Sequence, residues 1–189
     1  MTGKTHQIVG ISLGLGSFLT ETSAIYNPAT FAAVLAVSSI GALVPDIDSH
    51  SAQIWQTLPF GRFVGQVVDP LIAHRNFSHS ILGTAFFGYL FYKLISLAPA
   101  YWGLDHQLIL ITFIASYASH LLADMVTVEG VPLFFPYQRM FGIPPHPFEG
   151  VRIVTGKWFE NLIVFPLANL VLILIIANQW PKIHEILFK

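Results

Sequence analysis

The sequence predicts an all-α membrane protein: a polytopic bundle of four to five transmembrane helices with a metal site at one membrane face. Of the 189 residues, 54% are hydrophobic and only 10% are charged, a composition far from that of soluble domains. Five apolar segments approach the ~20 residues needed to cross the hydrocarbon core. They lie at about 7–20, 28–45, 78–98, 107–126 and 158–179. Residues 1–189 are therefore expected to form a single integral-membrane domain.

The first two apolar segments are bounded by recognisable signals. Segment 7–20 is rich in glycine, which predicts either a tightly packed helix or a partly inserted one, because small residues let helices approach closely. Segment 28–45 is expected to end at Pro45, since the residue before a proline is pushed out of the helical region.

The remaining three segments are long, continuous apolar runs. Segment 78–98 is expected to begin at an N-cap, either Asn76 or Ser78, whose side chain would accept a hydrogen bond from the first turn. Segments 107–126 and 158–179 follow after a short and a long connection. Long connections in a compact domain are commonly functional, which draws attention to residues 46–77 and 127–157.

Charge and cysteine content limit the possible partners and ligands. The net charge is −1 and the chain contains no long run of Lys or Arg, so nucleic acid is not an expected partner. The chain has no cysteine, which excludes disulfides, thiolate metal sites and a cysteine nucleophile. A metal would have to be bound by His, Asp, Glu or water.

Threading the five segments through a membrane gathers the ionisable residues on one side. Ionisable groups at membrane depth are costly and need a partner, a water-filled cavity or a metal. The residues gathered on the side where the chain starts are His6, Asp46, Asp48, His74, His79, His120 and Asp124. Six of the nine basic residues lie on the same side, namely Lys4, Arg62, Arg75, Arg139, Arg152 and Lys157. The positive-inside rule predicts that this side faces the cytoplasm.

His120 and Asp124 are four residues apart on segment 107–126, so both project from one helical face. The pair can supply two ligands to one metal, or a carboxylate that orients a metal-binding imidazole. The alternatives are a hydrogen bond between helices or a C-terminal cap.

Asp46 and Asp48 follow Pro45 directly. In an extended backbone, residues two apart point the same way, so both carboxylates would face one cation. Two adjacent carboxylates repel each other unless a cation or a proton neutralises one of them. The alternative is a turn with helix-capping aspartates. His50 is more simply interpreted as a solvated loop residue.

His74, Arg75 and His79 lie within seven residues of one another in His-Arg-Asn-Phe-Ser-His-Ser. On one continuous helix the two histidines would diverge by about 140°, so both reach one site only if the helix starts between them. Arg75 is positioned to grip a phosphate or carboxylate bidentately. Its alternative role is that of a positive-inside anchor.

The other candidates carry weaker signals. His6 lies immediately before the first apolar segment. Of the expected metal ligands, it is the one that its position in the sequence supports least. Glu160 lies near the start of segment 158–179 and is a candidate general base or a hydrogen-bond partner of nearby basic residues. Reserve candidates in the loops are Asp69, His146 and Glu149.

A donor set of nitrogen and oxygen atoms suits zinc or manganese, and enough ligands exist for one or two ions. The expected mechanism is attack by metal-activated water on an ester, with Arg75, Asp48 and Glu160 as catalytic residues. No nucleophile elbow or phosphate-binding glycine loop competes with this interpretation. The alternatives are a non-catalytic membrane protein stapled by its metal and a transporter of metal ions or protons.

The motifs as a set resemble the YdjM-type family of bacterial inner-membrane metal-dependent hydrolases. They are His6 before a Gly-rich segment, Pro45-Asp46-Ile47-Asp48, the 74–80 motif, and His120-Leu121-Leu122-Ala123-Asp124. Asn76 stands where the family more often has glycine. The resemblance implies a helical membrane fold and a hydrolase of the bacterial inner membrane. Together with the one-sided site, it leads us to expect a multi-pass protein that acts on a lipid or membrane-associated substrate at the cytoplasmic interface. The His/Asp pattern is also similar, more distantly, to zinc-dependent phospholipase C, an analogy that points to phosphate esters.

Overall fold

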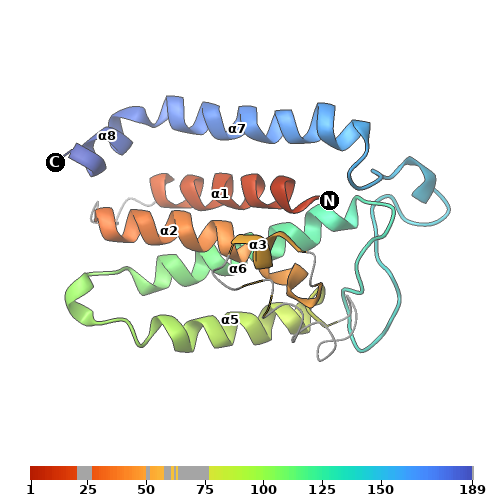
Figure 1. The fold of residues 1–189 in the computed structure, drawn as a ribbon, viewed down its shortest axis with the longest axis horizontal. Helices are drawn as coiled ribbons and strands as arrows, with labels where there is room; N and C mark the ends of the chain where they lie inside the picture. Colours follow the sequence, from red (N-terminus) through yellow and green to blue (C-terminus); the bar gives the residue numbers. More distant parts are fainter. Residues whose placement is uncertain (21–26, 50–51, 58–60, 62, 64–76, 189) are drawn as a thin grey trace.

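The computed structural model describes residues 1–20, 27–49, 52–57, 61, 63 and 77–188. These residues form an all-helical bundle (Figure 1). The longer helices are α1 (Gly3–Thr20), α2 (Pro28–Gly41), α5 (Ile81–Ile95), α6 (His106–Met125), α7 (Phe165–Asn178) and α8 (Trp180–Phe188). The short elements are α3 (Gln53–Thr57), the 3-10 helices η1 (Val44–Asp48), η2 (Ala100–Trp102) and η3 (Glu149–Val151), and the π-helical turn η4 (Glu160–Val164) that leads into α7.

Each of the five apolar segments expected from the sequence contains a helix. Their starts are set by polar caps: Asn27 accepts a hydrogen bond from Ala29 N at α2, and Asp105 accepts one from Leu108 N at α6. At α5 the cap is Ser80, which accepts from Gly83 N, so the expectation of Asn76 or Ser78 was wrong. Asn and Ser are both suitable N-cap residues, so residue type alone does not distinguish Asn76 or Ser78 from Ser80.

Helix α6 lies at the centre of the bundle and packs against α1, α2 and α5, while α1 also packs against α7. Glycines in α1 make the close approach possible, as the sequence predicted. A Cβ atom on Gly10 would lie 2.6 Å from Ala42 Cβ, and one on Gly14 would lie 2.5 Å from Ser38 Cβ. The Gly-rich segment is therefore a tightly packed helix.

Two helical stretches of the described residues are long and apolar enough to cross a membrane, α6 and Glu160–Asn178. Helices α2 and α5 are apolar but have only 14 and 15 residues, about 21–23 Å at 1.5 Å per residue against a hydrocarbon core of about 30 Å. The count is thus smaller than the four to five expected. Helix α1 has 18 residues but is not apolar enough, and in α2 and α5 helical structure stops short of the apolar runs. Pro45, for example, lies in η1, and α2 already ends at Gly41.

Large apolar side chains remain exposed on the outer faces of the bundle. On α7 they include Leu167, Ile173 and Leu174, each more than half exposed. On α5, Leu90 and Leu94 are similarly exposed. Figure 1 shows these two helices at opposite edges of the bundle. Contiguous apolar surface of this kind is expected where a helix faces lipid.

Candidate metal centre

The candidate ligands that the structure describes come from four segments that meet at one end of the bundle. His6 lies in the first turns of α1, Asp46 and Asp48 in η1, His79 just before α5, and His120 with Asp124 in the last turns of α6. The amino-terminal end of α1 and the carboxyl-terminal end of α6 lie close together in Figure 1. His74 and Arg75 lie outside the described residues.

His120 is completely buried and has one nitrogen without a hydrogen-bond partner. Its Nδ1 lies 2.7 Å from the carbonyl oxygen of Ala42. A carbonyl only accepts, so Nδ1 carries the proton and Nε2 carries the lone pair. That lone pair faces Asp46 Oδ1 at 3.6 Å and Asp124 Oδ2 at 3.5 Å. Three acceptors facing one another require a cation or an added proton between them.

His79 is oriented in the same way from the opposite side. The Ser78 hydroxyl donates to Asp48 Oδ2 at 3.0 Å and lies 3.2 Å from His79 Nδ1. A hydroxyl has one proton, and Ser78 donates it to Asp48, so the Ser78 oxygen accepts a hydrogen bond from His79 Nδ1–H. The lone pair of His79 is therefore on Nε2. His79 Nε2 lies 3.5 Å from Asp46 Oδ1 and 3.8 Å from Asp124 Oδ2.

Four ligand atoms therefore converge: His79 Nε2, His120 Nε2, Asp46 Oδ1 and Asp124 Oδ2. We refer to these four residues as the ligand quartet. The four nitrogen-to-oxygen distances run from 3.5 to 3.8 Å. Donor atoms bound to a tetrahedral zinc at 2.0–2.1 Å lie about 3.3 Å from one another. Within the quartet, Asp46, His79 and His120 offer ligand atoms that all lie within 4.8 Å of one another and could hold an ion.

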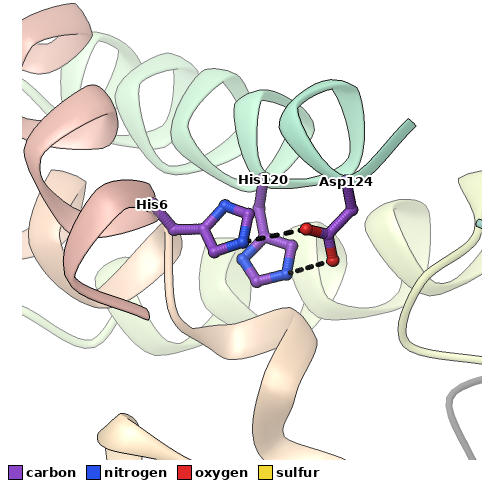
Figure 2. A group of neighbouring side chains, drawn as sticks. All are labelled: His6, His120 and Asp124. Atoms are coloured by element: carbon purple, nitrogen blue, oxygen red, sulfur yellow. Dashed lines mark ion pairs between the residues drawn. The ribbon is translucent and has the colours of Figure 1, made fainter. Parts of the chain in front are cut away.

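His6 adds a second group next to the quartet, as Figure 2 shows. Its ring stacks on that of His120, with centroids 3.6 Å apart, and its Nε2 lies 3.1 Å from Asp124 Oδ1. Asp124 therefore faces His6 with one oxygen and the quartet with the other. His6, His120 and Asp124 form a second set of residues that could hold an ion, and the amino group of Met1 also contacts Asp124.

The imidazoles beside Asp46 favour its ionised form. Burial raises the pKa of Asp46, but His79 and His120, when protonated on the nitrogens that face it, lower the pKa to about 2; a bound cation would take the place of these protons. A carboxylate that stays charged in a half-buried position is suited to bind a cation.

Asp48 takes a different place from the one expected. Residues 44–48 form a 3-10 helix, not an extended strand, so residues two apart diverge by about 120° rather than pointing the same way. The expected extended backbone was therefore wrong, while metal binding by Asp48 together with Asp46 stays a prediction. Asp46 faces the quartet, whereas Asp48 is buried behind His79 and holds it through Ser78.

Glu160 is fully buried and binds the start of α1. Its Oε1 accepts hydrogen bonds from Thr2 N, Thr2 Oγ1 and Thr5 Oγ1, and its Oε2 accepts one from Gly156 N, all at 2.7–2.8 Å. Four donors leave this carboxylate well satisfied, which favours an anchoring role over that of a general base.

Sequence reasoning overlooked the groups that orient the histidines. Ser78 was considered only as a helix cap, and Ala42 offers only its backbone carbonyl. Tyr117, buried in α6, donates to the carbonyl of Ser78. The Ser-His pair in the 74–80 motif was the one available signal, because a backbone contact such as that of Ala42 leaves no trace in residue types.

Comparison with known proteins finds relatives among inner membrane proteins. The family described as "YdjM inner membrane protein" matches residues 1–183. "Uncharacterized protein YvsG" of Bacillus subtilis is 31% identical over 165 residues, which cover 87% of this chain and 88% of that protein. "Inner membrane protein YdjM" of Escherichia coli is 26% identical over 144 residues, covering 76% and 70%, as is its counterpart in Shigella flexneri. No solved structure matches the chain. The chain belongs to the YdjM family of inner membrane proteins.

Proposed function

We propose that this protein is a multi-pass, metal-dependent hydrolase of the bacterial inner membrane. The reaction is attack of water on an ester of a lipid or membrane-associated substrate at the cytoplasmic interface, with phosphate esters as the first candidates. Zinc is the expected metal, manganese the second choice, with one or two ions bound.

The observation that carries the proposal is the ligand quartet. Two imidazoles and two carboxylates, drawn from three separate segments, bring their nitrogen and oxygen acceptors to within 3.5–3.8 Å of one another. Without a cation these acceptors would repel one another in a buried place, and the Nε2 of His120 would stay unsatisfied. Such an arrangement costs free energy unless something positive occupies it.

A bound divalent ion would supply a nucleophile at neutral pH by lowering the pKa of a coordinated water. The chain itself holds the ligands in place: Ala42 fixes the tautomer of His120, and Ser78 with Asp48 fixes that of His79. Partners of this kind are characteristic of metal-binding histidines. In this proposal Arg75, one residue after His74, holds the anionic part of the substrate.

Access to the quartet comes from a polar cavity of about 570 Å³ beside η1 and the start of α1. Asp46 and Asp48 line it from one side and Lys4 from another. Asp46 also lines a narrow cavity next to His79 and Asp124. Water and a polar head group therefore have a route to one edge of the quartet.

One alternative has its own support. Because the cluster joins α1, η1, α6 and the residue before α5, a bound metal would cross-link the whole end of the bundle, as in a structural site. A transporter is less favoured, because the quartet lies at one end of the bundle and the interior at the other end is an apolar cluster that includes Phe18, Val34 and Ile109.

The experiment is metal analysis of the purified protein, followed by assays on phosphate-ester and carboxylic-ester lipids. We expect at least one equivalent of zinc or manganese and hydrolysis of one ester class that stops when the metal is removed. A full metal complement without turnover on any ester would favour the structural alternative. Protein without metal after purification in metal-replete medium would refute both.

A further inference from the structure

We propose that Arg152, together with Arg139, forms a binding site for a phosphoryl group in the loop that follows α6. This inference rests on the proposed function for its role in the reaction, since it assigns a phosphate ester as substrate. Phosphate binding itself can be tested without turnover.

The guanidinium of Arg152 is held in a fixed position by the backbone around it. Its Nε donates to the carbonyl oxygen of Pro144 at 2.8 Å. A Cβ atom at Gly142 would lie 2.5 Å from Cζ and Nη1 of Arg152 and 2.9 Å from Nη2. The absence of a side chain at residue 142 therefore lets the guanidinium lie directly against the main chain.

The other two nitrogens of Arg152 are available to a ligand. Within the part of the chain that the structure describes, no residue forms a hydrogen bond or ion pair with Nη1 or Nη2. Arg152 and Arg139 both line a cavity of about 610 Å³, which is large enough for a phosphate ester. The cavity also contains two carboxylates, and each has a partner: Glu129 accepts from Thr155 at 3.2 Å, and Glu149 lies 3.8 Å from His146.

This cavity adjoins the candidate metal centre. Glu129 and Met140 line it and also line the narrow cavity bordered by Asp46, His79 and Asp124. Backbone hydrogen bonds fix the loop to the end of α6: Ile143 N donates to Met125 O at 2.7 Å, and Ile153 N donates to Val126 O at 3.0 Å. Arg152 is thus anchored to the helix that carries His120 and Asp124.

A planar guanidinium with its position set in advance is suited to bind phosphate through two parallel N–H donors. Little side-chain entropy is lost when such a group binds, because the protein has already ordered it. A phosphoryl group held here would present its ester towards the cavity at the metal centre. Its source is either a phospholipid head group or a soluble phosphate ester.

The test measures binding of radiolabelled inorganic phosphate to purified full-length protein, with zinc added, by equilibrium dialysis. Arg152→Gln should weaken binding about tenfold or more, since it removes charge-assisted hydrogen bonds. Gly142→Ala should also weaken it, because the new methyl group displaces the guanidinium. Lys157→Gln is the control: it removes the same charge from an exposed residue that does not line the cavity, and it should leave binding within about twofold at moderate salt.

Equal phosphate affinity in wild type and Arg152→Gln would overturn the proposal, because the phosphate would then bind elsewhere, for instance at the metal alone. Equal weakening by Arg152→Gln and Lys157→Gln would also overturn it, as a general charge effect. Loss of phosphate affinity in Arg152→Gln with an unchanged zinc content would support it, even if no hydrolysis is found, so its failure is distinct from that of the proposed function.

Competition identifies the source of the phosphoryl group. Glycerol 3-phosphate and dihexanoyl phosphatidic acid should each displace phosphate in an Arg152-dependent manner, and the stronger competitor indicates whether the substrate is soluble or lipid. If neither displaces it, a site for phosphate monoesters is refuted.

Discussion

At the scale of single residues, His120 has the most constrained environment in the candidate centre. It is buried, stacks on His6 and donates from Nδ1 to a backbone carbonyl. Among the described residues, the polar groups facing its Nε2 are carboxylates, which cannot donate when ionised. A proton on Nε2 would satisfy these contacts as an imidazolium, and a metal would satisfy them as a ligand. Metal content is therefore the measurement that separates the two.

The first prediction is that His120→Ala abolishes metal binding. The substitution removes one member of the quartet and leaves the carbonyl of Ala42 unpaired, at a cost of about 1–3 kcal/mol of folding free energy. His146→Ala is the matched control, because the side chain of His146 is 82% exposed and lies outside the quartet. Metal content is measured by elemental analysis after dialysis. Retention of a full equivalent by the His120 variant would show that the quartet does not bind the metal.

A second prediction concerns Arg75. Arg75→Ala should keep the metal and lose about 3 kcal/mol of transition-state stabilisation, roughly a hundredfold in kcat, as for other groups that stabilise developing charge. Steady-state kinetics on the substrate found in the ester screen, with metal content measured on the same sample, provides the check. An unchanged kcat would show that Arg75 does not act in catalysis and would favour its alternative role as a positive-inside anchor.

A third prediction separates orientation from ligation. Ser78→Ala leaves all four ligands in place but breaks the hydrogen-bonded link between Asp48 and His79, so metal affinity should fall about 10- to 100-fold. In the control, Ser119→Ala, the lost hydroxyl bonds only within α6, to the carbonyl of Ser116. Competition with a chelator gives the two affinities. Equal affinities would mean that Asp48 does not act through Ser78.

These residues also show what the sequence could and could not predict. The sequence was sufficient to predict that five of these residues meet, because threading places the helix end nearest to each on the same side of the membrane. They are His6, Asp46, His79, His120 and Asp124. The different positions of Asp46, which faces the two Nε2 atoms, and Asp48, which accepts from Ser78, were not predictable. They depend on whether residues 44–48 are extended or 3-10 helical, and both conformations tolerate the same residue types.

At the scale of elements, the packing of α1 against α2 connects the bundle to the centre. Gly10 lets α1 touch Ala42, and the carbonyl of Ala42 orients His120. Glu160 holds the start of the same helix against η4. The position of His6 in the cluster therefore depends on two contacts of α1: that of Gly10 with Ala42 and that of Thr2 and Thr5 with Glu160.

The fourth prediction follows from this connection. Gly10→Ala should lower stability by about 1–3 kcal/mol through overpacking, because the new methyl group would lie 2.6 Å from Ala42 Cβ and 2.7 Å from Ser38 O. It should also weaken metal binding, since Ala42 must move. Gly16→Ala is the control: nothing lies within 4 Å of its Cβ position, and alanine should add up to about 1 kcal/mol of helix propensity. Thermal unfolding in detergent compares the two, and similar midpoints would contradict the packing argument.

Helix positions were predicted well because long apolar runs have few alternatives in a membrane. Helix ends were predicted less well. The apolar run at 28–45 continues past Gly41, where α2 ends, into the start of η1. The residues after Gly41 are apolar because they are buried, although they are no longer part of α2. The same effect makes α2 and α5 shorter than the runs that contain them.

At the scale of the whole molecule, the two ends of the bundle differ in character. One end carries the His/Asp cluster, the polar cavity and the loop with Arg139 and Arg152. The other carries the α5–α6 connection, with exposed Leu97, Tyr101 and Trp102. Aromatic side chains at this end are typical of a membrane interface. The asymmetry fits a bundle that does its chemistry on one membrane face.

The last prediction is the orientation of this bundle. Leu97 and Val151 are 79% and 77% exposed and lie at opposite ends of the central helix α6, on either side of the proposed membrane. Because the cluster end carries most of the basic residues, Val151 is expected on the cytoplasmic side. The chain has no cysteine of its own, so Leu97→Cys and Val151→Cys can be labelled singly with a membrane-impermeant maleimide. In intact spheroplasts Leu97→Cys should react and Val151→Cys should react only after permeabilisation. The reverse pattern would place the centre outside the cytoplasm and remove cytoplasmic substrates from consideration, and labelling of both from one side would show that α6 does not cross the membrane.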